Sequence, residues 1–279
     1  MLISPIITPL TLAVAACAGP TAHELFATRV AERASAAPRF VPQDVNGGTR
    51  SRRTRSWSST RSEAAATYSQ SFAGAVLSAP ADTWNSVEGV IAVPIPTIPD
   101  IQNDTPNGTF AASAWVGIDG VTCANASLRA GVDFVVDSSG AVSYTAWHQW
   151  LPDDAVAFSN FTVNADDSIL LFVEALSPGL GLVLVENLSS GQLEEVEVEG
   201  SNALCEQDAE WIVGAAGAGL EPLPLANFGS VPFIDVSATK SNGQTANPGD
   251  AATVFEIVQN GIVLTNTSAN ATAVVVSFV

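Results

Sequence analysis

Segments of strand-forming residues, each ended by a turn, follow one another along the chain from Tyr68 to Val279. They are rich in Val, Ile, Phe and Thr, and turn-forming pieces such as Asp137-Ser-Ser-Gly140 separate them, while helical periodicity is nearly absent. We predict strands at residues 84–93, 112–119, 128–136, 141–150, 168–176, 180–187, 207–213, 225–238, 251–258 and 271–279. So many strands indicate an all-β protein, an antiparallel β-sandwich of two large sheets around one core.

Charge divides the chain into two parts. Eight of the ten basic residues lie between Arg29 and Arg61, whereas residues 67–279 hold 24 of the 28 acidic residues. This asymmetry predicts a basic pro-segment and linker at residues 23–66, followed by an acidic mature domain at 67–279. Because the repulsion between carboxylates fades as they protonate, we expect the domain to suit acid better than neutral solution. Nucleic acid is excluded as a partner by the same charge.

The first 22 residues are typical of a secretory signal peptide. Residues 3–18 are almost wholly apolar, and Ala16-Cys17-Ala18 offers small residues for cleavage. The apolar run is too short to span a bilayer, so we expect a secreted, extracellular protein without a membrane anchor. Asn-X-Ser/Thr sequons, consistent with a glycoprotein, begin at Asn103, Asn107, Asn125, Asn160, Asn187, Asn266 and Asn270.

Two cysteines remain after the signal peptide is removed. Cys123 and Cys205 form an even pair in an exported chain, which favours a disulfide. The alternative, a metal site, has only His148 as a further imidazole ligand, so we expect no metal and no cofactor. His148 is the single histidine of the predicted mature domain, and this, together with the absence of a Gly-X-Ser-X-Gly motif, also argues against a Ser-His-Asp triad.

Strand alternation predicts which side chains share a face of a sheet. In residues 112–119 the apolar Ala114, Val116 and Ile118 point to the core, which leaves the residues between them on the opposite face. The same alternation in residues 128–136 and 208–213 predicts one polar, concave surface that carries Trp115, Asp119, Arg129, Asp133 and Glu210.

Six runs of sequence resemble the fungal glutamic peptidases, also called eqolisins. They are Tyr68-Ser-Gln-Ser-Phe-Ala-Gly-Ala-Val-Leu77, Ala112-Ser-Ala-Trp-Val-Gly-Ile-Asp-Gly120, Gly131-Val-Asp-Phe134, Ala146-Trp-His-Gln-Trp-Leu-Pro-Asp153, Val185-Glu-Asn-Leu188 and Leu204-Cys-Glu-Gln-Asp-Ala-Glu-Trp-Ile-Val213. Together the runs span essentially the whole predicted mature domain, in the family's order. The resemblance implies a sandwich of two long antiparallel sheets, of the concanavalin A-like or jelly-roll kind.

The resemblance also implies roles for individual residues. Glu210 matches the family's catalytic glutamate, which acts as general base on the attacking water and then as acid toward the leaving amine. Arg129 stands where the family has the glutamine that donates to the oxyanion. Trp115 matches an aromatic residue that forms the substrate platform in the family, and Asp119 and Asp133 are predicted on the same face of the sheet. Phe72 and Gln149 replace a usual tryptophan and a usual glutamate at positions that are expected to line the cleft.

Two functions follow from these residues. The first is a monomeric, secreted acid endopeptidase that acts on protein or peptide substrates. It is made as a zymogen whose own pro-segment inhibits it by lying against the acidic cleft. The second is a catalytically silent homologue that binds peptide or glycan, because Arg129 can pair with Glu210, lower its pKa and occlude the water site. Asp119 and Asp133 could instead hold the guanidinium aside.

Overall fold

The computed structural model describes residues 66–100, 108–215, 223–249 and 251–279. The predicted signal peptide, nearly all of the pro-segment, and the sequons at Asn103 and Asn107 lie outside these residues. Among the described residues, no helix has the length and apolar character needed to cross a membrane.

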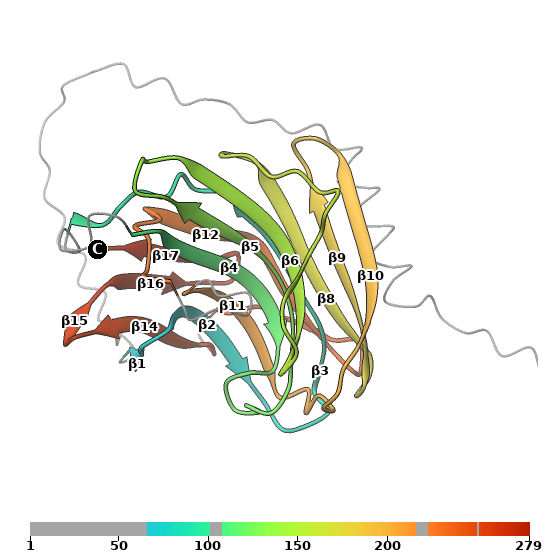
Figure 1. Cartoon of the computed structure of the whole chain (residues 1–279). Coiled ribbons are helices and arrows are strands. Elements are labelled where there is room, and N and C mark those ends of the chain that lie inside the picture. The colour runs from blue at the N-terminus through green and yellow to red at the C-terminus, as the bar shows by residue number, and fades with distance from the viewer. Residues whose placement is uncertain (1–65, 101–107, 216–222, 250) are drawn as a thin grey trace, which may run out of the picture. The chain divides into compact units, whose positions relative to one another are not determined.

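A nine-stranded sheet forms the first layer of the domain (Figure 1). Its spatial order is β1 (Thr67–Ser69), β14 (Thr253–Gln259), β2 (Phe72–Ser78), β11 (Asp208–Gly214), β4 (Phe110–Ile118), β5 (Ser127–Val136), β6 (Val142–Leu151) and β7 (Val156–Ala157), with β15 (Ile262–Val263) paired to β14. Its pairs are antiparallel except for β1 with β14, which is parallel.

An eight-stranded antiparallel sheet forms the second layer. Its order is β10 (Gln192–Glu199), β9 (Leu180–Asn187), β8 (Ser168–Ser177), β3 (Trp84–Ala92), β12 (Ser230–Lys240), β17 (Ala273–Phe278) and β16 (Thr265–Ala269), with β13 (Thr245–Ala246) paired to β12. Figure 1 shows both sheets as curved layers, with β4, β5 and β6 of the first beside β8 and β9 of the second. The predicted two-sheet antiparallel sandwich is confirmed.

The core lies between the two sheets, and strand alternation fills it as predicted. Ala114, Val116 and Ile118 of β4 are fully buried in the main apolar cluster. From the facing sheet, Leu171 of β8 and Val183 of β9 join the same cluster. The residues between them in sequence therefore point to the two outer faces of the sandwich.

Several strands differ from the prediction. The sequence did not predict strand β2, the charged strand β10, or the short strands β1, β7, β13, β15 and β16. In addition, β12 begins at Ser230 rather than at residue 225.

One predicted sequon is unsuitable for a glycan, because Asn187 is fully buried. Its side-chain amide donates to the carbonyl of Thr162 and to the carboxylate of Asp167, which ties this residue into the fold.

Candidate active site

Cross-strand rows on the outer face of the nine-stranded sheet bring the candidate site residues together. One row runs Val76, Glu210, Gly117, Arg129 and Gln149 across β2, β11, β4, β5 and β6. The next runs Gly74, Ile212, Trp115, Gly131 and Trp147 across the same strands. In each row one glycine stands between two large residues: Gly117 lies between Glu210 and Arg129, and Gly131 lies between Trp115 and Trp147, so these side chains lie close over the bare backbone.

Glu210 is almost completely buried in this surface, with 1% of its area exposed. Its Oε2 accepts a hydrogen bond of 3.4 Å from the indole Nε1 of Trp115, and the Nη2 of Arg129 lies 3.9 Å from the same oxygen. Among the described residues, its Oε1 has no hydrogen-bond partner. Burial raises the pKa of Glu210 to about 7, although the positive charge of Arg129 and the indole hydrogen bond oppose that rise.

The guanidinium of Arg129 is held from two sides. Its Nε donates to Ser127 Oγ at 2.9 Å, and that hydroxyl donates in turn to the carbonyl of Asp119 at 2.6 Å. Its Cζ lies 5.1 Å from the ring centroid of Trp115, within the range of a cation–π contact. Burial lowers the pKa of Arg129, and the charge of Glu210 opposes that shift. The cation is therefore held beside Glu210 rather than free to turn outward.

Gly117 leaves room for this pairing, since it lies between Glu210 and Arg129 in the row. A Cβ at this position would lie 3.2 Å from Arg129 Cγ and 3.4 Å from Glu210 Oε2. The bare backbone lets the arginine stem cross strand β4 toward the carboxyl group.

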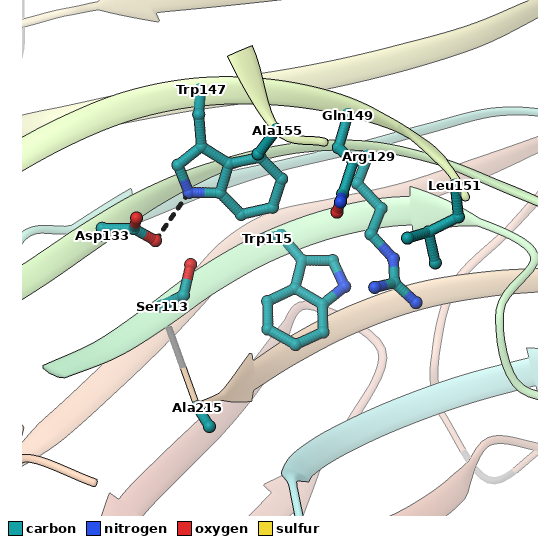
Figure 2. Close-up of a pocket in the computed structure, with 9 residues that line it drawn as sticks. All are labelled: Ser113, Trp115, Arg129, Asp133, Trp147, Gln149, Leu151, Ala155 and Ala215. Carbon is teal, nitrogen blue, oxygen red and sulfur yellow. Dashed lines mark hydrogen bonds between the residues drawn. The ribbon is translucent and has the colours of Figure 1, made fainter. Parts of the chain in front are cut away.

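A pocket of about 210 Å³ opens over the same face (Figure 2). Its lining residues are Ser113, Trp115, Arg129, Asp133, Trp147, Gln149, Leu151, Ala155 and Ala215. The indoles of Trp115 and Trp147 lie at 6.5 Å between centroids, tilted by 52°. Glu210 contacts two lining residues, Trp115 and Arg129, but is not itself one of them.

Asp133 and Gln149 line the pocket, as strand alternation predicts for Asp133 and as the family resemblance implies for Gln149. Asp133 Oδ1 accepts a 2.8 Å hydrogen bond from Trp147 Nε1, drawn in Figure 2, and burial raises the pKa of this carboxyl group. Gln149 donates to the carbonyl of Asp153 at 3.0 Å. Phe72, which was also expected to line the cleft, is not one of the lining residues; it pairs with Gly214, which pairs with the lining residue Ser113. Its ring packs on Phe255 at 5.0 Å between centroids, in the apolar cluster that includes Trp115 and Trp147.

Asp119 does not face the pocket, which corrects the prediction of a shared face. Strand β4 ends at Ile118, and Asp119 has a left-handed backbone with φ of 64°, so the alternation stops there. Its fully buried carboxylate accepts hydrogen bonds of 2.7–3.2 Å from the backbone amides of residues 205–208. Asp119 therefore positions the start of β11, and with it Glu210, rather than holding the guanidinium of Arg129.

The predicted disulfide between Cys123 and Cys205 is confirmed, and it lies next to the Asp119 hydrogen bonds. The Cα atoms of the two cysteines are 6.1 Å apart. Asp208 strengthens this link, because its carboxylate accepts bonds from the amide and the hydroxyl of Thr122 at 2.6 and 2.7 Å. The segment after β4 is thus tied to the segment before β11.

Three contributors to the site were missed by sequence reasoning. Trp147 shares the face of Gln149 by alternation and could have been found from that signal. Ser127 acts by accepting a hydrogen bond from Arg129, and Asp208 acts by accepting one from Thr122. No spacing of residues in the sequence indicates such contacts.

The geometry defines a site for acid–base chemistry. It combines a carboxyl group that titrates near neutrality, a neighbouring cation and a pocket floored by two indoles. A carboxyl group with such a pKa can both take up and return a proton in weakly acidic solution.

Comparisons with known proteins agree with this class of site. The model of the Peptidase A4 family matches residues 70–278. Aspergillopepsin-2 of Aspergillus niger is 41% identical over 226 residues, covering 76% of this chain and 78% of that protein. Scytalidopepsin B of Scytalidium lignicola is 33% identical over 189 residues, covering 64% and 70%. A crystal structure of scytalido-glutamic peptidase with a peptide-based transition state analog gives a TM-score of 0.64 at 30% identity, covering 75% of this chain and 98% of that one.

The chain belongs to the Peptidase A4 family. The resemblance to the glutamic peptidases is confirmed, and with it the assignment to the glutamic-type endopeptidases.

Proposed function

We propose that this protein is a secreted endopeptidase of weakly acidic solution, made as a zymogen, in which Glu210 activates the attacking water. The observation that carries the proposal is the environment of Glu210. A buried carboxyl group with one oxygen lacking a hydrogen-bond partner among the described residues lies beside a guanidinium at the pocket. That oxygen is the acceptor a catalytic water requires.

In the proposed reaction the ionised Glu210 takes a proton from water as the water oxygen attacks the peptide carbonyl carbon. The negative charge on the carbonyl oxygen is stabilised by the Arg129 guanidinium, a charged donor in a site of low dielectric. Glu210 then gives its proton to the amide nitrogen, the C–N bond breaks, and the carboxylate is regenerated. The indoles of Trp115 and Trp147 supply the apolar platform for the substrate chain.

The pH range follows from two opposing effects. The ionised fraction of Glu210 rises as pH increases toward and through its pKa of about 7, so the general base favours the upper end of the acid range. The stability of an acidic domain falls as pH rises, because more of its carboxyl groups are ionised and repel one another. We therefore expect the optimum on the acid side of neutrality.

A catalytically silent homologue is the second candidate, and the position of Arg129 favours it. The Arg129 side chain is 17% exposed and lines the pocket, whereas the Glu210 side chain is 1% exposed and does not. The guanidinium thus stands between the carboxyl group and the substrate side. In that case the pocket binds peptide without cleaving it.

The two candidates separate in a simple assay. Precursor that has been processed to the mature domain is incubated with a denatured protein substrate from pH 2 to pH 7, and new amino termini are counted. We expect cleavage that increases from pH 3 toward pH 6. No cleavage at any pH, with circular dichroism confirming a folded β-protein, would exclude the enzyme and leave the silent homologue.

A further inference from the structure

The guanidinium of Arg129 has hydrogen-bond donors that the rest of the site does not use. Its Nε donates to Ser127 Oγ at 2.9 Å, and this is the one hydrogen bond that the side chain forms to another described residue. Its Nη2 lies 3.9 Å from Glu210 Oε2, which is an ion-pair distance but too long for a hydrogen bond. Because a guanidinium carries five N–H donors in a planar fork, the four donors on its two terminal nitrogens are left for a ligand.

The free end of this fork belongs to the pocket. Arg129 is one of the lining residues, and Figure 2 shows its side chain extending along the pocket to place the guanidinium beside Trp115. The hydrogen bond to Ser127 and the contact with the Trp115 ring fix the direction of the fork. A donor group that is already held in place binds a ligand at a smaller cost in conformational entropy.

The other polar residues of the pocket do not neutralise the guanidinium through hydrogen bonds. Gln149 is the cross-strand partner of Arg129, and it carries an amide that donates to the carbonyl of Asp153. Asp133 is the one acidic residue of the lining, and its Oδ1 accepts the hydrogen bond of Trp147. The fork therefore lacks a carboxylate partner on the pocket side.

The pocket has the size and the walls for one acidic side chain. Its volume of about 210 Å³ is below the range of roughly 300–1,000 Å³ that is typical of sites for whole small-molecule ligands. The indoles of Trp115 and Trp147 offer apolar surface on which the methylene groups of a glutamate can pack. At the Arg129 end, the planar fork matches the two oxygens of a carboxylate.

Weak acid increases the contrast between the cation and its surroundings. Three carboxyl groups belong to the elements around Arg129, namely Glu210 on β11, Asp133 on β5 and Asp119 at the end of β4. Burial raises the pKa of all three, and that of Glu210 to about 7. At pH 5.5 Glu210 is mostly protonated, whereas a substrate glutamate with an ordinary pKa of about 4.3 is mostly ionised. The guanidinium then favours the carboxylate of the substrate.

We propose that the pocket over β4, β5 and β6 is a carboxylate-binding subsite, in which the fork of Arg129 donates to an acidic side chain of the substrate. The inference rests on the proposed function, because it takes a peptide as the ligand, and it names peptides with glutamate or aspartate beside the cleaved bond as the substrate class. The same guanidinium serves the oxyanion as well, since Nη2 lies beside Glu210 while further donors remain for the carboxylate.

Binding of three blocked amino acids tests the subsite without any need for catalysis. Protein processed to the mature domain is titrated at pH 5.5 with N-acetylglutamate α-methylamide, with its neutral glutamine counterpart, and with N-acetylglutamine that has a free α-carboxylate. Tryptophan fluorescence reports binding. We expect the glutamate probe to bind at least about tenfold more tightly than its neutral counterpart, the usual advantage of a charged hydrogen bond.

The other results of this titration contradict the proposal in different ways. Equal affinities for all three probes would overturn the carboxylate subsite. Tighter binding of the free α-carboxylate alone would overturn the acidic side chain as the ligand and assign the subsite to the new C-terminus of a cleaved product.

Two variants locate the preference at Arg129. Gln149→Glu places a competing carboxylate opposite the guanidinium, and Arg129→Gln removes the cation, so we expect the preference for the glutamate probe to fall below about twofold in each. Gln244→Glu is the matched control, because it makes the same chemical change at an exposed turn before β13 and should keep the full preference. A preference that persists in both pocket variants, with circular dichroism showing folded protein, would contradict the assignment.

Hydrolysis of longer peptides separates this inference from the proposed function. Pairs of substrates differ only by glutamate or glutamine at each of the two residues that flank the cleaved bond. At pH 5.5 we expect kcat/KM to be at least about tenfold higher with glutamate at one of these positions. Selective binding of the glutamate probe without hydrolysis at any pH would refute the enzyme and keep the subsite. Hydrolysis with no preference at either position would refute the subsite and keep the enzyme.

Discussion

Replacing Glu210 with glutamine is expected to lower kcat/KM for peptide hydrolysis by roughly 10²–10⁴-fold, the usual contribution of a general base. The amide keeps the size of the side chain and can still accept the 3.4 Å hydrogen bond from Trp115, but it cannot take a proton from water. Steady-state kinetics on a peptide substrate give the ratio. Glu199→Gln is the matched control, because it makes the same chemical change at an exposed end of β10 and should leave kcat/KM unchanged.

The same substitution should change how stability depends on pH. Because the pKa of Glu210 is raised from 4.5 to about 7 in the folded protein, the folded state binds more protons than the unfolded state between these values. The resulting stabilisation is present below pH 4.5 and is lost as pH rises through 7, a difference on the order of 3 kcal/mol. Urea unfolding at pH 4 and pH 8 should show this loss in the wild type and in Glu199→Gln, and a smaller one in Glu210→Gln.

Replacing Arg129 with glutamine is the second large change, and its effects follow from removing the charge beside a buried carboxyl group. Above pH 7 the ionised Glu210 loses its partner, and we expect a loss of stability of about 3–5 kcal/mol. At pH 4 the carboxyl group is protonated and the loss should be much smaller. Unfolding experiments at the two pH values measure the difference. Lys240→Gln is the control, because it removes the other basic residue of the domain.

Activity in Arg129→Gln separates the two candidate functions. If arginine stabilises the oxyanion, existing activity should fall at least tenfold at pH 5, since the loss of the cation also raises the pKa of Glu210 and reduces its ionised fraction. The silent homologue gives the opposite result, namely hydrolysis that appears only in the variant. A variant with unchanged activity would show that Arg129 has no part in the reaction.

Much of the fold could be predicted from the sequence, because alternation in a sandwich follows from burial. The core residues of β4, β5 and β11 were assigned correctly from this period alone. Strand β10 was missed, since Glu194, Glu195, Glu197 and Glu199 hide the alternation of Val196 and Val198 toward the core. Strand β10 forms because it pairs with β9, and its own composition does not indicate a strand.

The site could be predicted by face but not by register. Alternation places Arg129 and Glu210 on one surface, yet only the pairing of Gly117 with both of them sets their side chains within reach. The position of Asp119 depends on where β4 ends, because its own positive φ turns its carboxylate toward the backbone amides of residues 205–208, which lead into β11. Neither pairing nor strand end is encoded in a period of two residues.

The central claim is that the ionised form of Glu210 performs the reaction, and the pH profile of kcat/KM tests it most directly. For the mature wild-type enzyme we predict an ascending limb of unit slope with an apparent pKa near 7, which moves to higher pH in Arg129→Gln. A profile that stays flat or falls from pH 3 to pH 7 while the protein remains folded would contradict the assignment of Glu210 as the general base.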